Sequence, residues 1–421
     1  MLKGLRLHDV GPAESLSVSF GPRLNIVLGD NSLGKTFLLD VAWWALTRTW
    51  AGPIAAPMLK PGAKPSIAFT FDTSTKTTQE TSAYDRELQH WPRNQGRPPN
   101  PGLVVYARVD GGFSVWDPAQ NYWRTRSSTD DPDRPPAFHF RPEQVWAGFD
   151  RDRAGKTYCR GLVEDWGSWQ RENGDAFRQF CAVLADLSPD GEPLAPGPLT
   201  RIPEDRDRRD IPTLQTSYGA PVPIVYASAA VKRILGLAYL LVWTWTEHQR
   251  MSELRDLPLA RQVIFLVDEV EAHLHPRWQR TIVRALLDVV SAMHSHTAVQ
   301  LIAATHSPLV MASLEPYFDS DTDKLLHLAL RKNAVVLDEL PWTKEGDASS
   351  WLVSEAFGLA QARSLEAERA IEAAEAWARG DRKALPAKLK TKAAIQKELE
   401  RVLPSMDSFW PRWLLETGKV S

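Results

Sequence analysis

The chain has 421 residues, of which 43% are hydrophobic and 24% charged, a balance typical of globular rather than disordered proteins. Fifty Lys and Arg residues against 52 Asp and Glu residues give a formal net charge of −2, so any nucleic-acid surface must be a local patch. The longest largely apolar stretch, residues 234–245, is too short for a membrane span of roughly 20 residues, and the N-terminal residues lack a signal-peptide pattern. With two cysteines, Cys159 and Cys181, we expect a cytoplasmic protein without a disulfide framework.

The first half of the chain predicts strands, then a loop, then a helix. Apolar residues alternate or cluster in three short runs before a glycine-rich turn, which is typical of strands. From Lys35, apolar residues recur at helical spacing with no Gly or Pro until Gly52, which predicts a helix of about four turns. Pro, Gly, Asn and Asp then become dense, and we expect an insertion of mixed β and loop structure. The predicted strands of this half cover residues 2–7, 16–20, 24–28, 66–71, 103–109 and 112–116.

The second half alternates predicted helices with short apolar strands. The runs at 263–267 and 299–304 are typical of central strands in a parallel sheet. A Pro-rich connector at 188–212 contains the sequence RIPEDRDRRD, whose charges cancel and indicate a solvated link. This alternation predicts an α/β sheet with helices on its faces. The predicted helices cover residues 162–187, 228–250 and 276–293, and a charged helical tail begins near residue 364.

Residues 29–36 read GDNSLGKT and match the phosphate-loop pattern G-x-x-x-x-G-K-[ST] between a predicted strand and a predicted helix. The glycines let successive backbone N–H groups face phosphates, and the start of the helix adds positive partial charge. We expect Lys35 to neutralise the β and γ phosphates of ATP and Thr36 to ligate Mg²⁺. The alternative is a chance glycine turn that contains a lysine. The expected nucleotide-binding residues of this loop are Gly29, Asp30, Asn31, Ser32, Leu33, Gly34, Lys35 and Thr36.

The apolar strand at 263–267 ends in two acids, Asp268 and Glu269, which is the Walker B form. A carboxylate at the end of a buried strand is costly unless it meets a cation or a proton. We expect Asp268 to hold Mg²⁺ through water and Glu269 to polarise the attacking water. The alternative is a strand whose acidic end simply emerges into solvent.

Three histidines follow these acids. His306, in the sequence THSP at the end of the strand at 299–304, is expected to bond the γ-phosphate and hold the attacking water. His273 and His275 lie two residues apart in the sequence EAHLHP, and with Glu271 they allow a metal interpretation. A third clear ligand is missing, so we favour a loop that packs at a subunit interface.

The order of these motifs resembles the ABC-type ATPases of the RecF, SMC and OLD group. Asn31 matches an asparagine that the group often carries in its phosphate loop, and YASAAVKR at 226–233 looks like the group's signature helix. The resemblance implies a P-loop ABC-type ATPase core that dimerises around ATP and Mg²⁺, with Ser228 reaching the nucleotide of the partner. Ala230 stands where the group has glycine, and its Cβ would hinder close backbone approach, which predicts slow turnover.

Within this group, the sequences DEVEAHLHPRWQR, THSPLVMASLE and DSFWPRWLLE are similar to stand-alone ATPases of bacterial anti-phage defence, the Septu ATPases among them. The OLD nucleases add a Toprim domain with a Glu followed by Asp-x-Asp. Here the acidic sequence DSDTD at 319–323 precedes Glu339, so we expect no nuclease in this chain. The resemblance implies a core at 1–50 and 214–345, a mixed β/α insertion at 51–213, and a helical C-terminal region at 346–421.

Two segments are candidates for contact with nucleic-acid phosphates. Residues 379–401 carry eight basic and three acidic residues, a net of +5, although a solvated helix face or a protein-docking tail fits equally well. Residues 90–97 combine Trp91 with Arg93 and Arg97 and are a weaker candidate.

The sequence is compatible with three functions. The first is an ATP-dependent switch that forms a homodimer or higher homo-oligomer and controls a partner effector, a nuclease encoded nearby. The second is a RecF-like repair or recombination ATPase that acts directly on DNA. The third is a nucleotide-dependent scaffold that hardly turns over. A transporter ATPase fits least, because the signature is degenerate and the interval before it is long.

Overall fold

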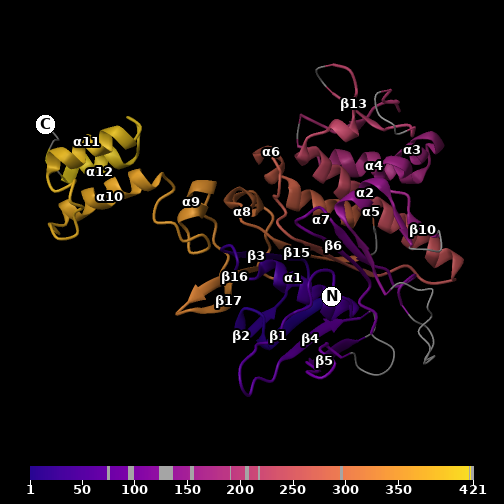
Figure 1. The fold of residues 1–421 in the computed structure, drawn as a ribbon. Helices are drawn as coiled ribbons and strands as arrows, with labels where there is room; N and C mark the ends of the chain where they lie inside the picture. Colours follow the sequence, from indigo (N-terminus) through magenta and orange to yellow (C-terminus); the bar gives the residue numbers. More distant parts are fainter. Residues whose placement is uncertain are drawn as a thin grey trace. The chain divides into compact units, whose positions relative to one another are not determined.

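The computed structural model describes residues 1–73, 76–92, 99–122, 136–151, 156–189, 191–203, 208–216, 219–293, 297–416 and 418. It divides into two compact units, Met1–Gly346 and Asp347–Ser421 (Figure 1). Arg93 and Arg97 of the weaker basic segment, and residues 204–207 of the charged connector, lie outside the described residues.

The first unit is built on an eight-stranded mixed sheet with the order β17-β16-β3-β15-β14-β6-β7-β8. Strands β16, β3, β15, β14 and β6 run parallel, and the strands at both ends are antiparallel to their neighbours. All residues of β6 and β14 are buried, as expected for parallel strands covered on both faces. The strands are β3 (Leu24–Gly29), β6 (Leu103–Ala107), β7 (Phe113–Trp116), β8 (Phe138–Phe140), β14 (Gln262–Val267), β15 (Ala298–Ala304), β16 (Lys324–Arg331) and β17 (Ala334–Leu340).

A second, antiparallel sheet of the first unit has the order β2-β1-β4-β5. Its strands alternate buried and exposed residues, so one face is apolar and the other polar. Leu5 pairs with Val18 on one side and Phe69 on the other, and all three belong to the apolar face. The strands are β1 (Leu2–Val10), β2 (Ala13–Ser19), β4 (Ser66–Asp72) and β5 (Thr77–Ala83).

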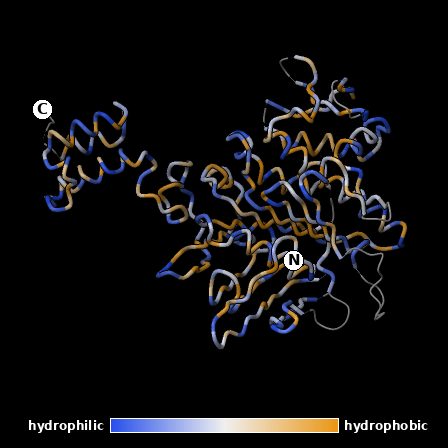
Figure 2. Tube along the Cα trace, viewed as in Figure 1, coloured by the Kyte–Doolittle hydropathy of each residue, from blue (hydrophilic) through white to orange (hydrophobic). Residues whose placement is uncertain are grey.

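Helix α1 (Lys35–Thr47) contacts strands of both sheets, including β1 and β3. Every residue of α1 except Thr36 and Phe37 is buried, which explains a sequence that is apolar nearly all round. Trp43 and Trp44 join one core cluster with residues of both sheets. Figure 2 shows hydrophobic residues concentrated along the central strands of this unit.

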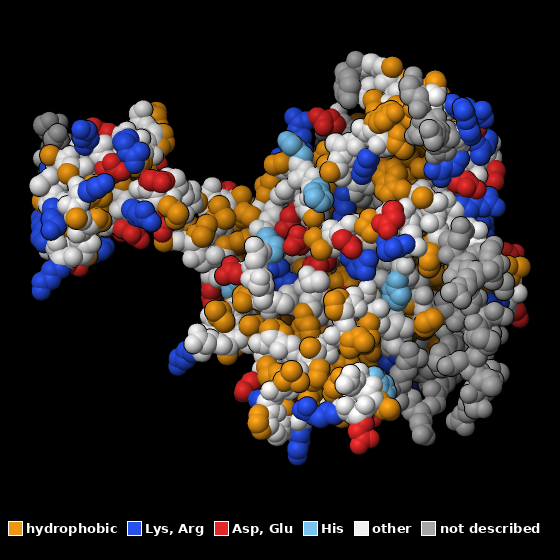
Figure 3. Space-filling model, in the orientation of Figure 1, with side chains coloured by type: hydrophobic (Ala, Val, Ile, Leu, Met, Phe, Trp, Pro, Cys, Tyr) orange, Lys and Arg blue, Asp and Glu red, His pale blue; other side chains and the backbone are white. Residues whose placement is uncertain are grey.

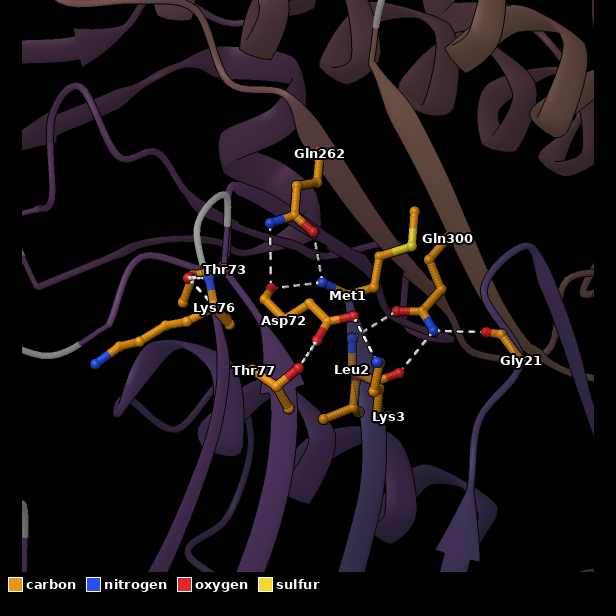
Figure 4. Close-up of polar contacts among 10 residues, drawn as sticks. All are labelled: Met1, Leu2, Lys3, Gly21, Asp72, Thr73, Lys76, Thr77, Gln262 and Gln300. Carbon is orange, nitrogen blue, oxygen red and sulfur yellow. Dashed lines mark hydrogen bonds and ion pairs between the residues drawn. The ribbon is translucent and has the colours of Figure 1, made fainter.

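Two glutamines tie the start of the chain to the central sheet (Figure 4). Gln300 in β15 is fully buried, and its side chain accepts a hydrogen bond from Leu2 N and donates to Leu2 O and Gly21 O. Gln262 in β14 accepts from the amino group of Met1 at 2.6 Å. Burial of this amino group lowers its pKa to about 5. Buried polar side chains therefore hold β1 against the parallel strands.

Helices and short strands complete the first unit. The long helix α5 (Ala229–Leu254) begins at Ser228 and is contacted by α2, α3 and α4. The remaining helices are α2 (Pro142–Ala147), α3 (Leu162–Glu172), α4 (Asp175–Asp186), the 3-10 helix η1 (Ile224–Tyr226), α6 (Pro276–Gln279), α7 (Ile282–Met293) and α8 (Pro308–Leu314). The short strands are β9 (Phe149–Arg151), β10 (Lys156–Cys159), β11 (Ala195–Pro196), β12 (Thr213–Gln215) and β13 (Val222–Pro223).

The second unit is helical and has its own apolar core around the fully buried Trp413. Ser364 and Thr391 cap its two longer helices, because each side chain accepts a hydrogen bond from a backbone N–H of the first turn. The helices are α9 (Ala348–Val353), α10 (Leu365–Ala378), α11 (Lys392–Val402) and α12 (Phe409–Glu416).

Most elements predicted from the sequence are confirmed, with three differences. Strand β4 pairs with β1, and β6 lies beside β14 in the central sheet, so residues expected to form an insertion complete both sheets. The helices predicted at 162–187 and 276–293 are each two helices, α3 with α4 and α6 with α7. The β16–β17 hairpin was not predicted. The domain boundaries stay a prediction, and among the described residues no helix combines the length and apolar character of a membrane span.

Candidate nucleotide-binding site

The glycine-rich turn joins the end of β3 to the start of α1. Gly29, Ser32 and Gly34 have backbone φ angles of +144°, +67° and +101°. Residues other than glycine rarely adopt positive φ. A Cβ at Gly29 would lie 2.5 Å from Leu328 O, so the close approach of β16 admits glycine alone. The backbone therefore curls tightly immediately before the first turn of α1, as a phosphate-binding loop requires.

Lys35 lies over this turn. Its Nζ donates to Gly29 O at 2.7 Å and Asp30 O at 3.0 Å. The side chain is buried, and burial lowers the pKa of the ammonium while the carboxylates of Glu269 and Asp268 act in the opposite direction. The cation is thus positioned at the mouth of the loop and held by backbone carbonyls.

Thr36 and Asp268 are in contact although 232 positions separate them in the sequence. Thr36 Oγ1 donates to Asp268 Oδ2 at 2.8 Å. Asp268 is 1% exposed, and its other oxygen, Oδ1, has no hydrogen-bond partner among the described residues. Burial raises the pKa of Asp268, and the bond from Thr36 partly offsets this. The carboxylate of Asp268 therefore has one buried oxygen that accepts no hydrogen bond from any described residue, and the hydroxyl of Thr36 lies beside this carboxylate. Oxygen ligands of this kind suit a hard divalent cation such as Mg²⁺.

The expected water-activating residues lie close to each other. Glu269 follows Asp268 with φ of +46°, and its Oε1 is 4.0 Å from Nε2 of His306. Both side chains are partly exposed, at 40% for Glu269 and 31% for His306. The structure therefore brings together Lys35, Thr36, Asp268, Glu269 and His306 from three separate parts of the sequence.

Glu271 joins the loop after β14 to the loop after β15. Its Oε2 accepts from Thr305 Oγ1 at 2.7 Å, and its Oε1 accepts from the backbone N–H of His306. Val270 N donates to Ala304 O at 3.1 Å beside this pair. The carboxylate thereby fixes the backbone that carries His306, a role that the sequence analysis missed.

These bonds bear on the metal interpretation of His273 and His275. Both oxygens of Glu271 are occupied by Thr305 and His306, and His275 Nδ1 accepts from Arg277 N. Among the described residues no group of three or more His, Cys, Asp or Glu could hold a metal ion. The placement of this loop at a subunit interface stays a prediction.

The predicted signature lies at the start of α5. Ser228 is exposed and caps the helix, since Val231 N donates to its Oγ at 3.3 Å. Arg233, one turn further, is buried, and its guanidinium donates to Arg108 O at 2.6 Å and to Asp268 O at 3.4 Å. The helix of the predicted signature thus contacts the backbone of Asp268, the predicted Walker B acid. The position of Arg233 directly before an apolar run was the sequence feature that could have pointed to a buried arginine here.

Asp40 is a further acid near this site that the sequence analysis missed. It lies in α1 one turn after Thr36 and is 7% exposed. Burial raises the pKa of its carboxyl to about 6, and the negative charge of Asp268 adds to this effect. A single acid within the apolar sequence TFLLDVAWW was the signal that could have found it.

The fold and this site define a P-loop ATPase core of α/β architecture. The chain belongs to the family described as "AAA domain, putative AbiEii toxin, Type IV TA system", whose model matches residues 24–312.

Curated relatives match shorter stretches. The chain is 38% identical to the "Septu protein PtuA" of Bacillus mycoides (strain KBAB4) over 97 residues, which are 23% of this chain and 12% of the relative. It is 42% identical to the "Retron Vc95 probable ATPase" of Vibrio cholerae serotype O1 biovar El Tor over 57 residues, 14% of this chain and 10% of the relative. These matches span about a tenth of the length of each relative.

Among solved structures, the chain is similar to an SMC head bound to the C-winged helix domain of ScpA. The identity is 15% and the TM-score 0.44, with coverage of 80% of this chain and 98% of the other. The SMC head domain from Thermotoga maritima gives 16% identity and a TM-score of 0.39, with coverage of 81% and 99%.

Proposed function

We propose that the protein binds and hydrolyses ATP, dimerises around the nucleotide, and thereby regulates a partner effector, a nuclease, in bacterial anti-phage defence. The observation that carries the ATPase part is the contact of Thr36 with Asp268, whose second buried oxygen has no hydrogen-bond partner among the described residues. These two groups are the pair that a nucleotide-bound Mg²⁺ needs.

Each residue of the site has a role in this proposal. The backbone N–H groups of residues 29–34 bind the phosphates of ATP, and Lys35 supplies a matching positive charge. Thr36 and Asp268 would hold Mg²⁺, which supplies neutralisation of phosphate charge. Glu269 orients a water molecule and accepts its proton, and His306 donates a hydrogen bond to the γ-phosphate.

Ser228 supports the dimer part of the proposal. It is exposed at the start of α5, so a second copy has access to its hydroxyl and to the first N–H groups of the helix. Ala230 follows two residues later, where its methyl group limits backbone approach to a phosphate. We therefore expect tight nucleotide-dependent association with slow turnover.

The defence role rests on the names of the two curated relatives, a Septu protein and a retron ATPase. The test is mass photometry of the purified protein with and without ATP and Mg²⁺, alone and with the product of the neighbouring gene. Glu269→Gln, which removes the proton acceptor, is expected to accumulate the dimer, and Lys35→Ala to abolish it. If the wild type and the Glu269→Gln variant both stay monomeric with ATP and Mg²⁺, the dimer proposal is refuted.

A second candidate is a nucleotide-dependent scaffold, which Ala230 favours. It predicts phosphate release at background and undiminished by Lys35→Ala, although assembly of the wild type still needs ATP. Measured release above background that Lys35→Ala and Glu269→Gln both abolish would support the enzyme instead. A RecF-like ATPase acting on DNA predicts that duplex DNA stimulates hydrolysis without any partner protein.

A further inference from the structure

The second unit carries a concentration of positive charge that the site above does not use. Residues 379–401 have a net charge of +5 in a chain whose net charge is −2. The segment runs from the end of α10 into α11, and these two helices pack against each other. Figure 3 shows Lys and Arg side chains, with acidic ones among them, on the visible face of this unit.

The arginines of this segment already have partners within the unit. Arg379 pairs with Glu375 at 3.7 Å, and Arg401 pairs with Glu398 at 2.6 Å. The guanidinium of Arg382 lies 3.3 Å from the ring centroid of Trp377. Their charges are therefore partly satisfied by the protein itself.

Four lysines of the segment differ from these arginines. All four are exposed, and among the described residues none of them makes a side-chain hydrogen bond or ion pair, although the charge of Lys388 acts on Glu398. We call this set the lysine patch: Lys383, Lys388, Lys390 and Lys397.

Two lysines of the patch lie where they do not stabilise α11. Lys390 immediately precedes Thr391, the cap of α11, and Lys388 lies two residues before Lys390, at the end where the helix presents positive partial charge. Cations at this end are repelled by the positive end of the helix dipole. An anion there would be attracted both by the lysines and by that end of the helix. The charges thus complement a negatively charged partner rather than α11 itself.

The surroundings of the patch favour phosphates over a protein surface. Protein interfaces have apolar or aromatic residues at their centre. Every large exposed hydrophobic residue described in this unit lies outside residues 379–401, and Trp377 is covered by Arg382. The exposed hydrophobic residues of the unit are Val353, Leu359, Leu365, Met406, Leu414 and Leu415.

We propose that the lysine patch binds the phosphate backbone of a nucleic-acid duplex without reading its sequence. Lysine contacts to phosphate release counterions, so affinity falls steeply with salt. Four contacts predict a slope of about −3.6 in a plot of log affinity against log salt concentration. The inference goes beyond the proposed function, because it holds whether or not the chain hydrolyses ATP.

The test is fluorescence anisotropy of the full chain with a labelled 24-base-pair DNA duplex of random sequence, between roughly 50 and 200 mM salt. The patch variant replaces Lys383, Lys388, Lys390 and Lys397 with Glu. A matched control replaces four exposed lysines of the first unit with Glu, which changes the net charge equally: Lys64, Lys76, Lys332 and Lys344. Circular dichroism and thermal melting establish that both variants fold.

The expected result is a loss of at least tenfold in affinity and of most of the salt slope in the patch variant, with the control close to the wild type. Absence of duplex binding by the wild type at the lowest salt would overturn the proposal. Equal losses in both variants would overturn it as well, because net charge would then be the cause. Poly-glutamate that competes as strongly as DNA at equal charge would assign the patch to an acidic protein instead.

Discussion

Glu271→Gln tests whether the two loops of the site act as one unit. In the wild type, the carboxylate accepts two hydrogen bonds, from the hydroxyl of the fully buried Thr305 and from the backbone N–H of His306. The glutamine amide keeps one acceptor oxygen and places an NH₂ donor where the second acceptor stood. The amide oxygen can accept from only one of the two donors, so the double tie of the carboxylate to Thr305 and to the backbone of His306 is lost.

The size of the effect follows from these two bonds. A hydrogen bond to a charged group contributes about 1.5–3 kcal/mol, so we expect the free energy of unfolding of the first unit to fall by about that amount. Displacement of His306 by about 1 Å is expected to lower kcat for ATP hydrolysis by about 10- to 100-fold. KM for ATP should change less than kcat, because Glu271 bonds the backbone of His306 and reaches Lys35 only through its charge.

The assay is steady-state phosphate release over a range of ATP concentrations, together with thermal unfolding. Glu253→Gln is the control, since Glu253 is exposed on α5 and the substitution removes the same charge. A Glu271→Gln variant with wild-type kcat would refute the positioning role. An equal change of kcat and KM would indicate general damage to the site instead.

Three further predictions follow from buried polar groups. Arg233→Met removes the guanidinium that bonds the backbone of Asp268, and it should lower ATP-dependent dimer formation at least tenfold in mass photometry while nucleotide binding by the monomer persists. Burial raises the pKa of the Asp40 carboxyl from 3.8 to about 6, so the folded state binds the carboxyl proton more tightly than the unfolded state does. The free energy of unfolding should therefore fall by at most about 3 kcal/mol as pH rises from 4 to 6. In urea unfolding, Asp40→Asn should lack this part of the pH slope, and an identical slope in both proteins would contradict the assignment. Gln300→Leu removes the side-chain bonds to the buried N–H and C=O of Leu2 and one of the two bonds to the C=O of Gly21, which still accepts from Asn25 Nδ2 at 3.0 Å, so we expect a loss of about 2–4 kcal/mol in the same assay, and an unchanged midpoint would argue against it.

The local elements of this protein follow from short stretches of sequence. The turn GDNSLGKT between an apolar strand and an apolar helix is specified by its glycines: Gly29 has a positive φ and lies too close to β16 for a Cβ, and Gly34 has a positive φ that favours glycine. The runs 263–267 of β14 and 301–304 of β15 are apolar and buried, because parallel strands are covered on both faces. Apolar runs and periodicity over five to fifteen residues were enough to predict these elements, and hence to place Asp268 and Glu269 at the end of a buried strand.

Tertiary structure alone decided which distant residues meet. Thr36 and Asp268 are 232 positions apart, and their contact depends on the strand order of the central sheet, which no local pattern encodes. The same holds for β4 and β6, which composition assigned to an insertion although they pair with β1 and β14. Glu271 and Arg233 gained their roles in this way too, because an acid or an arginine acquires a partner only when packing brings a donor or a carbonyl within reach.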